Sequence, residues 1–287
     1  MSKTTGSKTT ESKTTESKTT EADSHYDQIE TMSTEAIVTA INQEDQTVAH
    51  AVNKAIPQII PLINAVAETM ISGGRLFYIG AGTSGRLGIL DASECPPTFG
   101  VDPGQVVGLI AGGDNAIRHA VEGAEDNQEQ AWVDLKQAGI KDREAVIGIA
   151  ASGQTPYVIG GLSAARKQGS ITGCITCNNG TDLAKAVDYP IEVVVGPEFI
   201  TGSTRMKAGT AQKMVLNIIS TAVMIKCGHI EGNKMVNMAL SNDKLIARGT
   251  RMVMEKTDIK DPEEARTLLI EHGSVRKAVE YYNALQS

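Results

Sequence analysis

The sequence predicts an α/β fold, a doubly wound parallel sheet with a small helical module at the C-terminal end. Short apolar runs alternate with helical patterns through the middle of the chain. Continuous apolar strands separated by helices are typical of a parallel sheet covered on both faces. The composition agrees, because aromatic residues make up only 3% of the chain while glycine occurs 28 times. A chain of 287 residues can form one large domain with a small appendage.

The chain divides into three segments by composition. Residues 2–21 repeat a pentapeptide, Ser-Lys-Thr-Thr followed by Gly or Glu, which has no apolar side chain to bury. We therefore predict a disordered tail over residues 1–24, whose removal leaves activity and stability unchanged. We assign residues 25–239 to the α/β domain and residues 240–287 to the helical module. In this module Asp261-Pro262-Glu263-Glu264 has the pattern of a helix start, with Asp as the N-cap.

The secondary structure elements follow from apolar periodicity. Helical spacing begins at about Ile29 and continues to Met70, where Pro57 and Pro61 predict a kink or two abutting helices. A long helix from about Ser203 to Lys226 is apolar around most of its circumference, which indicates burial in the core or at a subunit interface. Between these two, strands are predicted at residues 76–79, 106–110, 145–150, 171–177 and 191–195, with helices at 116–138 and 157–168 among them.

A glycine-rich turn follows the first predicted strand. Gly80-Ala81-Gly82-Thr83-Ser84 leads into a helix, and a helix N-terminus behind a glycine turn suits a phosphate group. The spacing of Gly80, Gly82 and Gly85 also fits the dinucleotide fingerprint, but the acidic residue that should follow about 20 positions later comes late, at Asp114. A phosphate loop is excluded because no Gly-Lys-Ser/Thr follows. A purely structural turn is the remaining alternative.

Two more hydroxyl-rich turns occupy the same topological position. Ala151-Ser152-Gly153-Gln154-Thr155 follows the third strand, and Thr201-Gly202-Ser203-Thr204 precedes the long helix. Ligands of open parallel sheets bind outside the carboxyl ends of the strands. Each turn alone is typical of an ordinary helix N-cap, whereas three together predict a shared anion site. Its predicted members are Gly82, Thr83, Ser84, Ser152, Gly153, Gln154, Thr155, Ser203, Thr204 and Lys207.

These motifs resemble a known family. The first two turns are similar to the phosphate turns of the sugar isomerase domain. More narrowly, residues 80–98, 120–126 and 201–213 resemble the N-acetylmuramic acid 6-phosphate etherase family, and the likeness extends over about residues 28–250. The resemblance implies a dimeric enzyme without a cofactor that releases D-lactate from carbon 3 of the sugar. Elimination followed by hydration would leave N-acetylglucosamine 6-phosphate, with Glu94 and Glu125 as the catalytic residues.

The position of Glu94 in the sequence favours a role as a general acid, apart from the resemblance. We expect it at the end of a short helix over residues 84–93, just before Pro96 and Pro97. A carboxylate there meets the negative end of the helix dipole, which raises its pKa and favours a general acid. From the residues alone, an exposed glutamate without a role is the alternative. The resemblance assigns Glu94 as the proton donor.

Glu125 is a candidate through the resemblance only. Glu122, Glu125 and Glu129 recur at helical spacing, which normally indicates a solvated helix face. Arg86, Arg205 and Lys207 are candidates for binding the phosphate or the lactyl carboxylate.

Charge and composition exclude other functions. The formal net charge is −7 with no basic stripe, so we expect no nucleic acid partner. No metal site is expected, because the histidines lack ligand spacing and Cys174-x-x-Cys177 lies in an apolar run. Without a signal peptide or a long apolar run, the chain is expected to be cytoplasmic and free of membrane. The apolar surface of the helix over residues 203–226 and of the first helical segment, together with the family resemblance, predicts a homodimer. The alternative functions are a non-catalytic sugar-phosphate-binding regulator on the same domain and an aldose–ketose isomerase.

Overall fold

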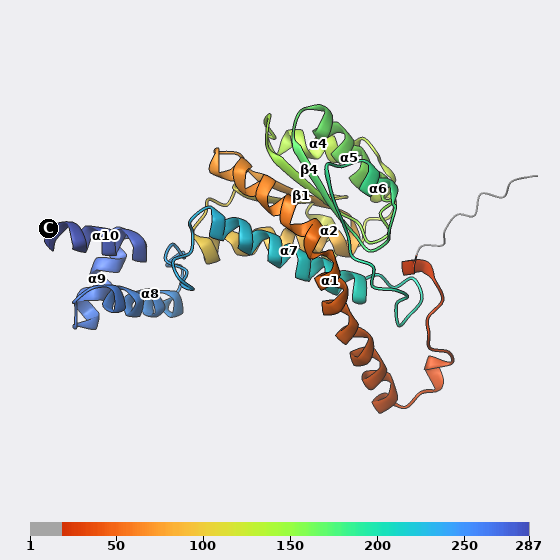
Figure 1. Ribbon diagram of the computed structural model, residues 1–287, viewed down its shortest axis with the longest axis horizontal. Coiled ribbons are helices and arrows are strands. Elements are labelled where there is room, and N and C mark those ends of the chain that lie inside the picture. The colour runs from red at the N-terminus through yellow and green to blue at the C-terminus, as the bar shows by residue number, and fades with distance from the viewer. Residues whose placement is uncertain (1–18, 287) are drawn as a thin grey trace, which may run out of the picture.

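The computed structural model describes residues 19–286 and contains one parallel sheet (Figure 1). Its five strands lie in the order β2-β1-β3-β4-β5, and every neighbouring pair is parallel. The predicted doubly wound α/β fold is confirmed. The strands are β1 (Leu76–Gly80), β2 (Val106–Ile110), β3 (Ala145–Ile149), β4 (Ile171–Thr176) and β5 (Tyr189–Glu192).

Helices cover both faces of this sheet. Side chains alternate along a strand, so Tyr78 of β1 packs into the apolar cluster on one face while its neighbour Phe77 packs into the cluster on the other. The first face is covered by α1 (Thr34–Ile71), α2 (Gly82–Phe99) and α7 (Lys207–Lys226). The second is covered by α4 (Gln130–Gln137), α5 (Pro156–Lys167) and α6 (Asp182–Lys185). Besides three C-terminal helices, the described residues form four short elements, which are η1 (Thr19–Glu21), η2 (Ile29–Thr31), α3 (Asn115–Arg118) and η3 (Ala124–Asp126).

Prolines neither divide α1 nor end α2 before Pro96. The alternative of two abutting helices at Pro57 and Pro61 is therefore wrong, whereas the alternative of a kink stays a prediction. Helix α1 is one helix containing Pro57 and Pro61. Each proline leaves the carbonyl four residues earlier without its N–H partner. Those carbonyls belong to Asn53 and Pro57, which are exposed residues, so water can bind them. Helix α2 likewise continues through Pro96-Pro97, which fall in its last turn, and ends at Phe99.

Two further limits differ from the prediction. The helix predicted over residues 116–138 is divided into α3, η3 and α4, because Gly123 has a φ of 72° that an α-helix cannot contain. Glu122, Glu125 and Glu129 therefore do not share one helix face. The long helix begins at Lys207 rather than Ser203, so Ser203 and Thr204 lie in the turn before it.

The C-terminal helices form a body with its own apolar core. Figure 1 shows α8 (Asp243–Lys256), α9 (Pro262–His272) and α10 (Val275–Gln286) projecting from the sheet domain. The predicted helix start is present, since Asp261 caps α9 and accepts a hydrogen bond from Glu263 N. The module meets the end of α2, where Ala239 N donates to Pro97 O. Its core comprises Val236, Met238, Met252, Val253, Ile259, Ala265, Leu269, Val275 and Ala278.

The N-terminal tail was predicted to be disordered through residue 24. Residues 1–18 lie outside the described part of the chain. Residues 19–24 do not fit the prediction, because Thr20 is 0% exposed and Ser24 bonds to the loop before α7. The prediction that the tail can be removed without effect assumed that it does not pack, and residues 19–24 do pack against the domain.

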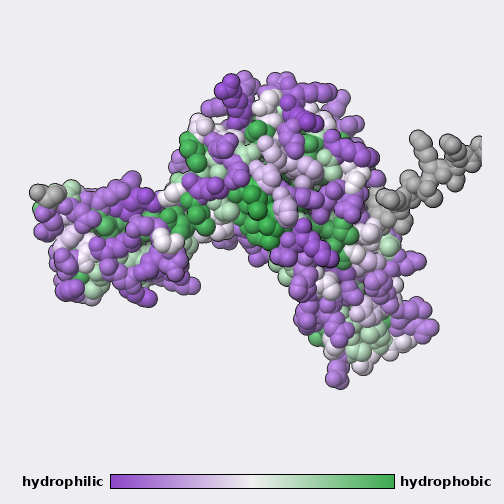
Figure 2. All heavy atoms as spheres, in the orientation of Figure 1, coloured by the Kyte–Doolittle hydropathy of each residue, from purple (hydrophilic) through white to green (hydrophobic). Residues whose placement is uncertain are grey.

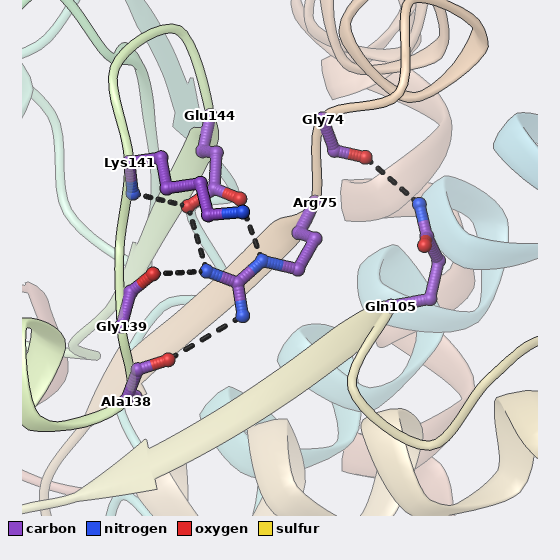
Figure 3. Close-up of polar contacts among 7 residues, drawn as sticks. All are labelled: Gly74, Arg75, Gln105, Ala138, Gly139, Lys141 and Glu144. Carbon is purple, nitrogen blue, oxygen red and sulfur yellow. Dashed lines mark hydrogen bonds and ion pairs between the residues drawn. The ribbon is translucent and has the colours of Figure 1, made fainter.

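An ion pair joins β1 to β3 at their amino ends (Figure 3). Arg75 Nε donates to Glu144 Oε1 at 2.6 Å, and another guanidinium nitrogen donates to Gly139 O at 2.5 Å. The second oxygen of Glu144 accepts from Lys141 N at 2.7 Å, which fixes the buried carboxylate. These bonds hold the adjacent starts of the two strands.

A buried carboxylate ties α2 to the sheet and to α7. Asp91 Oδ2 accepts from Tyr78 OH at 3.0 Å, and its Oδ1 accepts from Ser220 Oγ at 3.1 Å and Asn217 Nδ2 at 3.2 Å. Burial raises the pKa of the Asp91 carboxyl, although these three donors act in the opposite direction. The network fixes the rotation of α2 about its axis.

Replacing Asp91 with Ala leaves these three donors without their acceptor. We expect Asp91→Ala to lower the free energy of unfolding by about 3 kcal/mol, measured by urea denaturation. Ser93→Ala, at an exposed position on the same helix, should change it by less than about 0.5 kcal/mol. Equal stability of the two variants would show that the network does not hold α2.

Candidate active site

The carboxyl ends of β1 and β3 form the topological switch point of the sheet. The two strands are neighbours, and Gly80 pairs in register with Ile149. Helix α2 leaves β1 towards one face of the sheet, while α5 follows β3 and covers the other face. A crevice opens where connections diverge in this way, and ligands of open α/β sheets bind there.

Two helix N-termini meet at this crevice without side-chain caps. Ala81, the N-cap of α2, makes no capping hydrogen bond, and Gly82 beside it is exposed with a φ of 50°. Thr155, the N-cap of α5, also makes none. Uncapped N–H groups and the positive ends of two helix dipoles favour an anion between them.

The second turn is held in shape from behind. Gly153 has a φ of 67°, and a Cβ there would lie 2.4 Å from Thr181, so only glycine fits. Ser152 Oγ accepts from Gln154 N at 3.3 Å, which fixes the hydroxyl at the mouth of the turn. Thr83 in the first turn is half-buried beside α7, where a Cβ on Gly209 would contact its methyl group.

Ser84 lies deeper than predicted. It is 8% exposed, and its hydroxyl donates to Gln212 Oε1 of α7 at 3.0 Å. Within the described residues, the buried Gln212 Nε2 has no hydrogen-bond partner. The side chain of Ser84 therefore links α2 to α7, while its turn faces the crevice.

The third turn does not offer a free helix N-terminus. The carboxylate of Glu198, which is 1% exposed, accepts from Lys207 N at 2.8 Å and from Ala208 N at 2.9 Å. The protein therefore places its own anion where a ligand was predicted. Lys207 is also occupied, because its Nζ lies 2.5 Å from Glu44 Oε2 in a buried ion pair with α1. Neither Glu198 nor Glu44 could be identified as a partner of this turn from the sequence near it.

A cavity of about 240 Å³ adjoins the first turn. It contains Glu125, which η3 presents, and Arg86, whose Nε donates to Ile117 O at 2.8 Å. Glu122 lies in the same wall and was not selected from the sequence. The lining residues are Ala81, Gly82, Arg86, Ala111, Ala116, Ala120, Val121, Glu122, Gly123, Ala124 and Glu125.

Glu94 does not lie in this cavity. It is exposed inside α2 rather than at the helix end, so the dipole argument for its acidity does not apply. At 1.5 Å per residue, the twelve residues from Gly82 to Glu94 place it about 18 Å along the helix axis. One chain thus brings together Gly82, Arg86 and Glu125, but not Glu94. Arg205 is exposed outside the cavity.

Curated relatives share most of the chain. An N-acetylmuramic acid 6-phosphate etherase of Christiangramia forsetii is 63% identical over 257 residues, 90% of this chain and 93% of the relative. One from Porphyromonas gingivalis is 60% identical over the same shares. The chain belongs to the N-acetylmuramic acid 6-phosphate etherase family.

Two broader comparisons concern the fold of the domain. The family model of the glucokinase regulatory protein N-terminal SIS domain matches residues 58–166. A phosphoheptose isomerase from Francisella tularensis superposes on this chain with a TM-score of 0.52 at 16% sequence identity. The superposition covers 68% of this chain and 100% of the isomerase chain. At that identity the likeness shows the fold.

Other sequence features have structural roles. Cys174 and Cys177 lie in the apolar clusters on opposite faces of the sheet, as expected for strand positions three apart. Burial raises the pKa of the Cys177 thiol to about 12, so it is protonated at neutral pH. Among residues 19–286 no group of three or more His, Cys, Asp or Glu could hold a metal, and no helix there could cross a membrane.

The capping role of Glu198 is testable by stability. Glu198→Ala removes the acceptor of two buried N–H groups, and we expect the free energy of unfolding to fall by about 2 kcal/mol. Glu129→Ala, at an exposed position, serves as the control and should change it by less than about 0.5 kcal/mol in the same urea titration. A Glu198 variant as stable as the control would contradict the capping role.

Proposed function

We propose that this chain cleaves the lactyl ether of N-acetylmuramic acid 6-phosphate, giving N-acetylglucosamine 6-phosphate and D-lactate. The observation that carries the proposal is the crevice at the switch point, which has the uncapped N-termini of α2 and α5, in a member of the etherase family. The N-terminus of α2 also borders the cavity that Glu125 lines. The reaction serves the recycling of cell-wall amino sugars. A non-catalytic regulator is not favoured, because a relative 63% identical is named an etherase and both glutamates that the family resemblance assigns, Glu94 and Glu125, are present.

The sugar phosphate is held by the first two turns. Backbone N–H groups of Gly82, Thr83 and Ser84 lie at the start of α2, and Thr83 adds a hydroxyl. The segment Ser152–Thr155 supplies a hydroxyl and the N-terminus of α5. Hydrogen bonds from neutral donors to a phosphate are charge-assisted, so this site does not need a lysine. In the third turn, Thr204 lies near Thr83, since a Cβ on Gly209 would contact both residues, whereas Lys207 is held by Glu44.

The chemistry needs two acid–base groups. In the open-chain sugar, the aldehyde at carbon 1 acidifies the hydrogen on carbon 2. Glu125 removes this hydrogen, Glu94 protonates the departing ether oxygen, and water then adds to the unsaturated intermediate. Arg86 lies in the cavity of Glu125, where its guanidinium group suits the lactyl carboxylate. No cofactor or metal takes part in this scheme.

A homodimer supplies the missing glutamate. Since Glu94 lies about 18 Å along α2 from the first turn, the site needs Glu94 of the partner subunit. Figure 2 shows hydrophobic side chains gathered over α1 and α7. The exposed apolar residues on α1, α2 and α7 include Ile56, Ile60, Leu90, Ile218 and Ile225, which a second copy would cover.

The location proposed for this enzyme is the cytoplasm. All four cysteines are free thiols, as is usual in a reducing compartment. The proposed substrate is a small sugar phosphate, and the scheme involves neither nucleic acid nor a membrane.

The function is tested by D-lactate release. The purified protein should release lactate from N-acetylmuramic acid 6-phosphate, and far less from the dephosphorylated sugar. Ser152→Ala should raise KM by about 10- to 100-fold, because a hydrogen bond to a charged group contributes about 1.5–3 kcal/mol. Equal turnover of the two sugars would contradict the phosphate site, and no lactate from either would contradict the function.

The shared site is tested by complementation. Glu94→Gln and Glu125→Gln should each be nearly inactive as homodimers. A heterodimer of the two, co-expressed with different tags and purified on both, should recover about half of the wild-type rate, because one of its two sites is intact. The two homodimers mixed without subunit exchange serve as the control. A heterodimer that stays inactive, or a monomer in light scattering, contradicts the shared site.

A further inference from the structure

The segment Thr19–Tyr26 is hydrogen-bonded to the loops that follow β4 and β5, at the carboxyl edge of the sheet. We call this segment the strap. Its first part forms a single 3₁₀ turn, and Thr20 is 0% exposed. Thr20 Oγ1 accepts from Asn178 Nδ2 at 2.9 Å, and Thr20 N donates to Asn178 Oδ1 at 3.2 Å. The hydroxyl of Thr19 donates to the same oxygen at 3.0 Å. The amide of Asn178 is thus bound on both of its polar atoms.

Asn178 connects the strap to the second turn. It follows β4 and is buried. Its Nδ2 also donates to Ala151 O at 3.1 Å, and Ala151 directly precedes Ser152. A single buried amide therefore links Thr20 to the backbone that places the Ser152 hydroxyl.

The other end of the strap holds the third turn. Ser24 Oγ donates to Phe199 O at 2.8 Å, and Ser24 N donates to Thr201 Oγ1 at 2.9 Å. The ring of Tyr26 lies against Phe199 with 5.0 Å between centroids. Residues 193–206 contain no helix or strand, so their backbone depends on such outside partners.

We propose that the strap is a positioning element of the sugar-phosphate site, acting through Thr20 and Asn178 on the second turn and through Ser24 on the third. The proposal rests on the proposed function of this site. The strap touches no reacting atom in this scheme. Its effect is to keep the turns in their binding-competent arrangement, and the apparent affinity falls with the fraction of molecules in that arrangement. A loosened strap should therefore raise KM and leave kcat unchanged.

The repeat supplies a matched control. Thr-Thr-Glu occurs at residues 19–21, where it is docked, and also at residues 14–16. In the full chain, Thr20→Val keeps the side-chain shape but removes the hydroxyl. We expect its KM to rise by up to about tenfold, the limit that corresponds to one hydrogen bond of about 1.4 kcal/mol, with kcat unchanged. Thr20→Ser should restore KM, and Thr15→Val should leave both constants at their wild-type values.

A second measurement separates positioning from mere folding. If the strap and the phosphate site are coupled, the coupling is reciprocal. Inorganic phosphate should then slow hydrogen exchange at the amides of Thr20 and Ser24 in the wild-type protein, and do so less in Thr20→Val. This readout does not need the etherase reaction, so it separates failure of the strap from failure of the function.

The proposal is overturned by any of three results. The first is a KM in Thr20→Val that does not differ from wild type. The second is a kcat in Thr20→Val that falls by the same factor as KM rises, with neither constant restored in Thr20→Ser. The third is hydrogen exchange at the strap amides that phosphate does not slow.

Discussion

The parallel pairing of β1 with β3 is the constraint on which the site depends. It places Gly80 beside Ile149, so the two helices that follow these strands begin at one crevice. Each helix N-terminus contributes about 0.3–1 kcal/mol to binding an anion through its dipole, and the N–H groups add directed hydrogen bonds. The bonds of Arg75 with Glu144 hold the opposite ends of the same strands. A slip in this pairing would separate the two turns.

The sequence predicted the sheet and its turns because those signals are local. Apolar runs such as residues 145–149 determine a strand, and the glycines at 82 and 153 determine a turn, from the residues next to them in the sequence. The parts that were missed depend on distant partners. Glu198 binds the N-terminus of α7, Glu44 pairs with Lys207, and Asn178 binds Thr20 across 158 residues. Likewise, prolines usually end helices, but here they fall in a last turn or beside exposed carbonyls.

The two glutamates illustrate the same limit. Their membership of one site is implied by the family, whereas in a single chain Glu125 lies in the cavity and Glu94 is exposed on the far part of α2. Both observations agree if the catalytic unit is a dimer. This arrangement also explains why exposed apolar residues gather on α1 and α7, which no other described element covers.

The central claim is that the phosphate is bound by the N-termini of α2 and α5 rather than by lysine. A crystal structure with N-acetylglucosamine 6-phosphate bound tests this most directly. The account predicts a phosphate within hydrogen-bond distance of the first turn at Thr83 and the second turn at Ser152, with Lys207 still paired to Glu44. A phosphate bound to Lys207, with Glu198 displaced from α7, would contradict it.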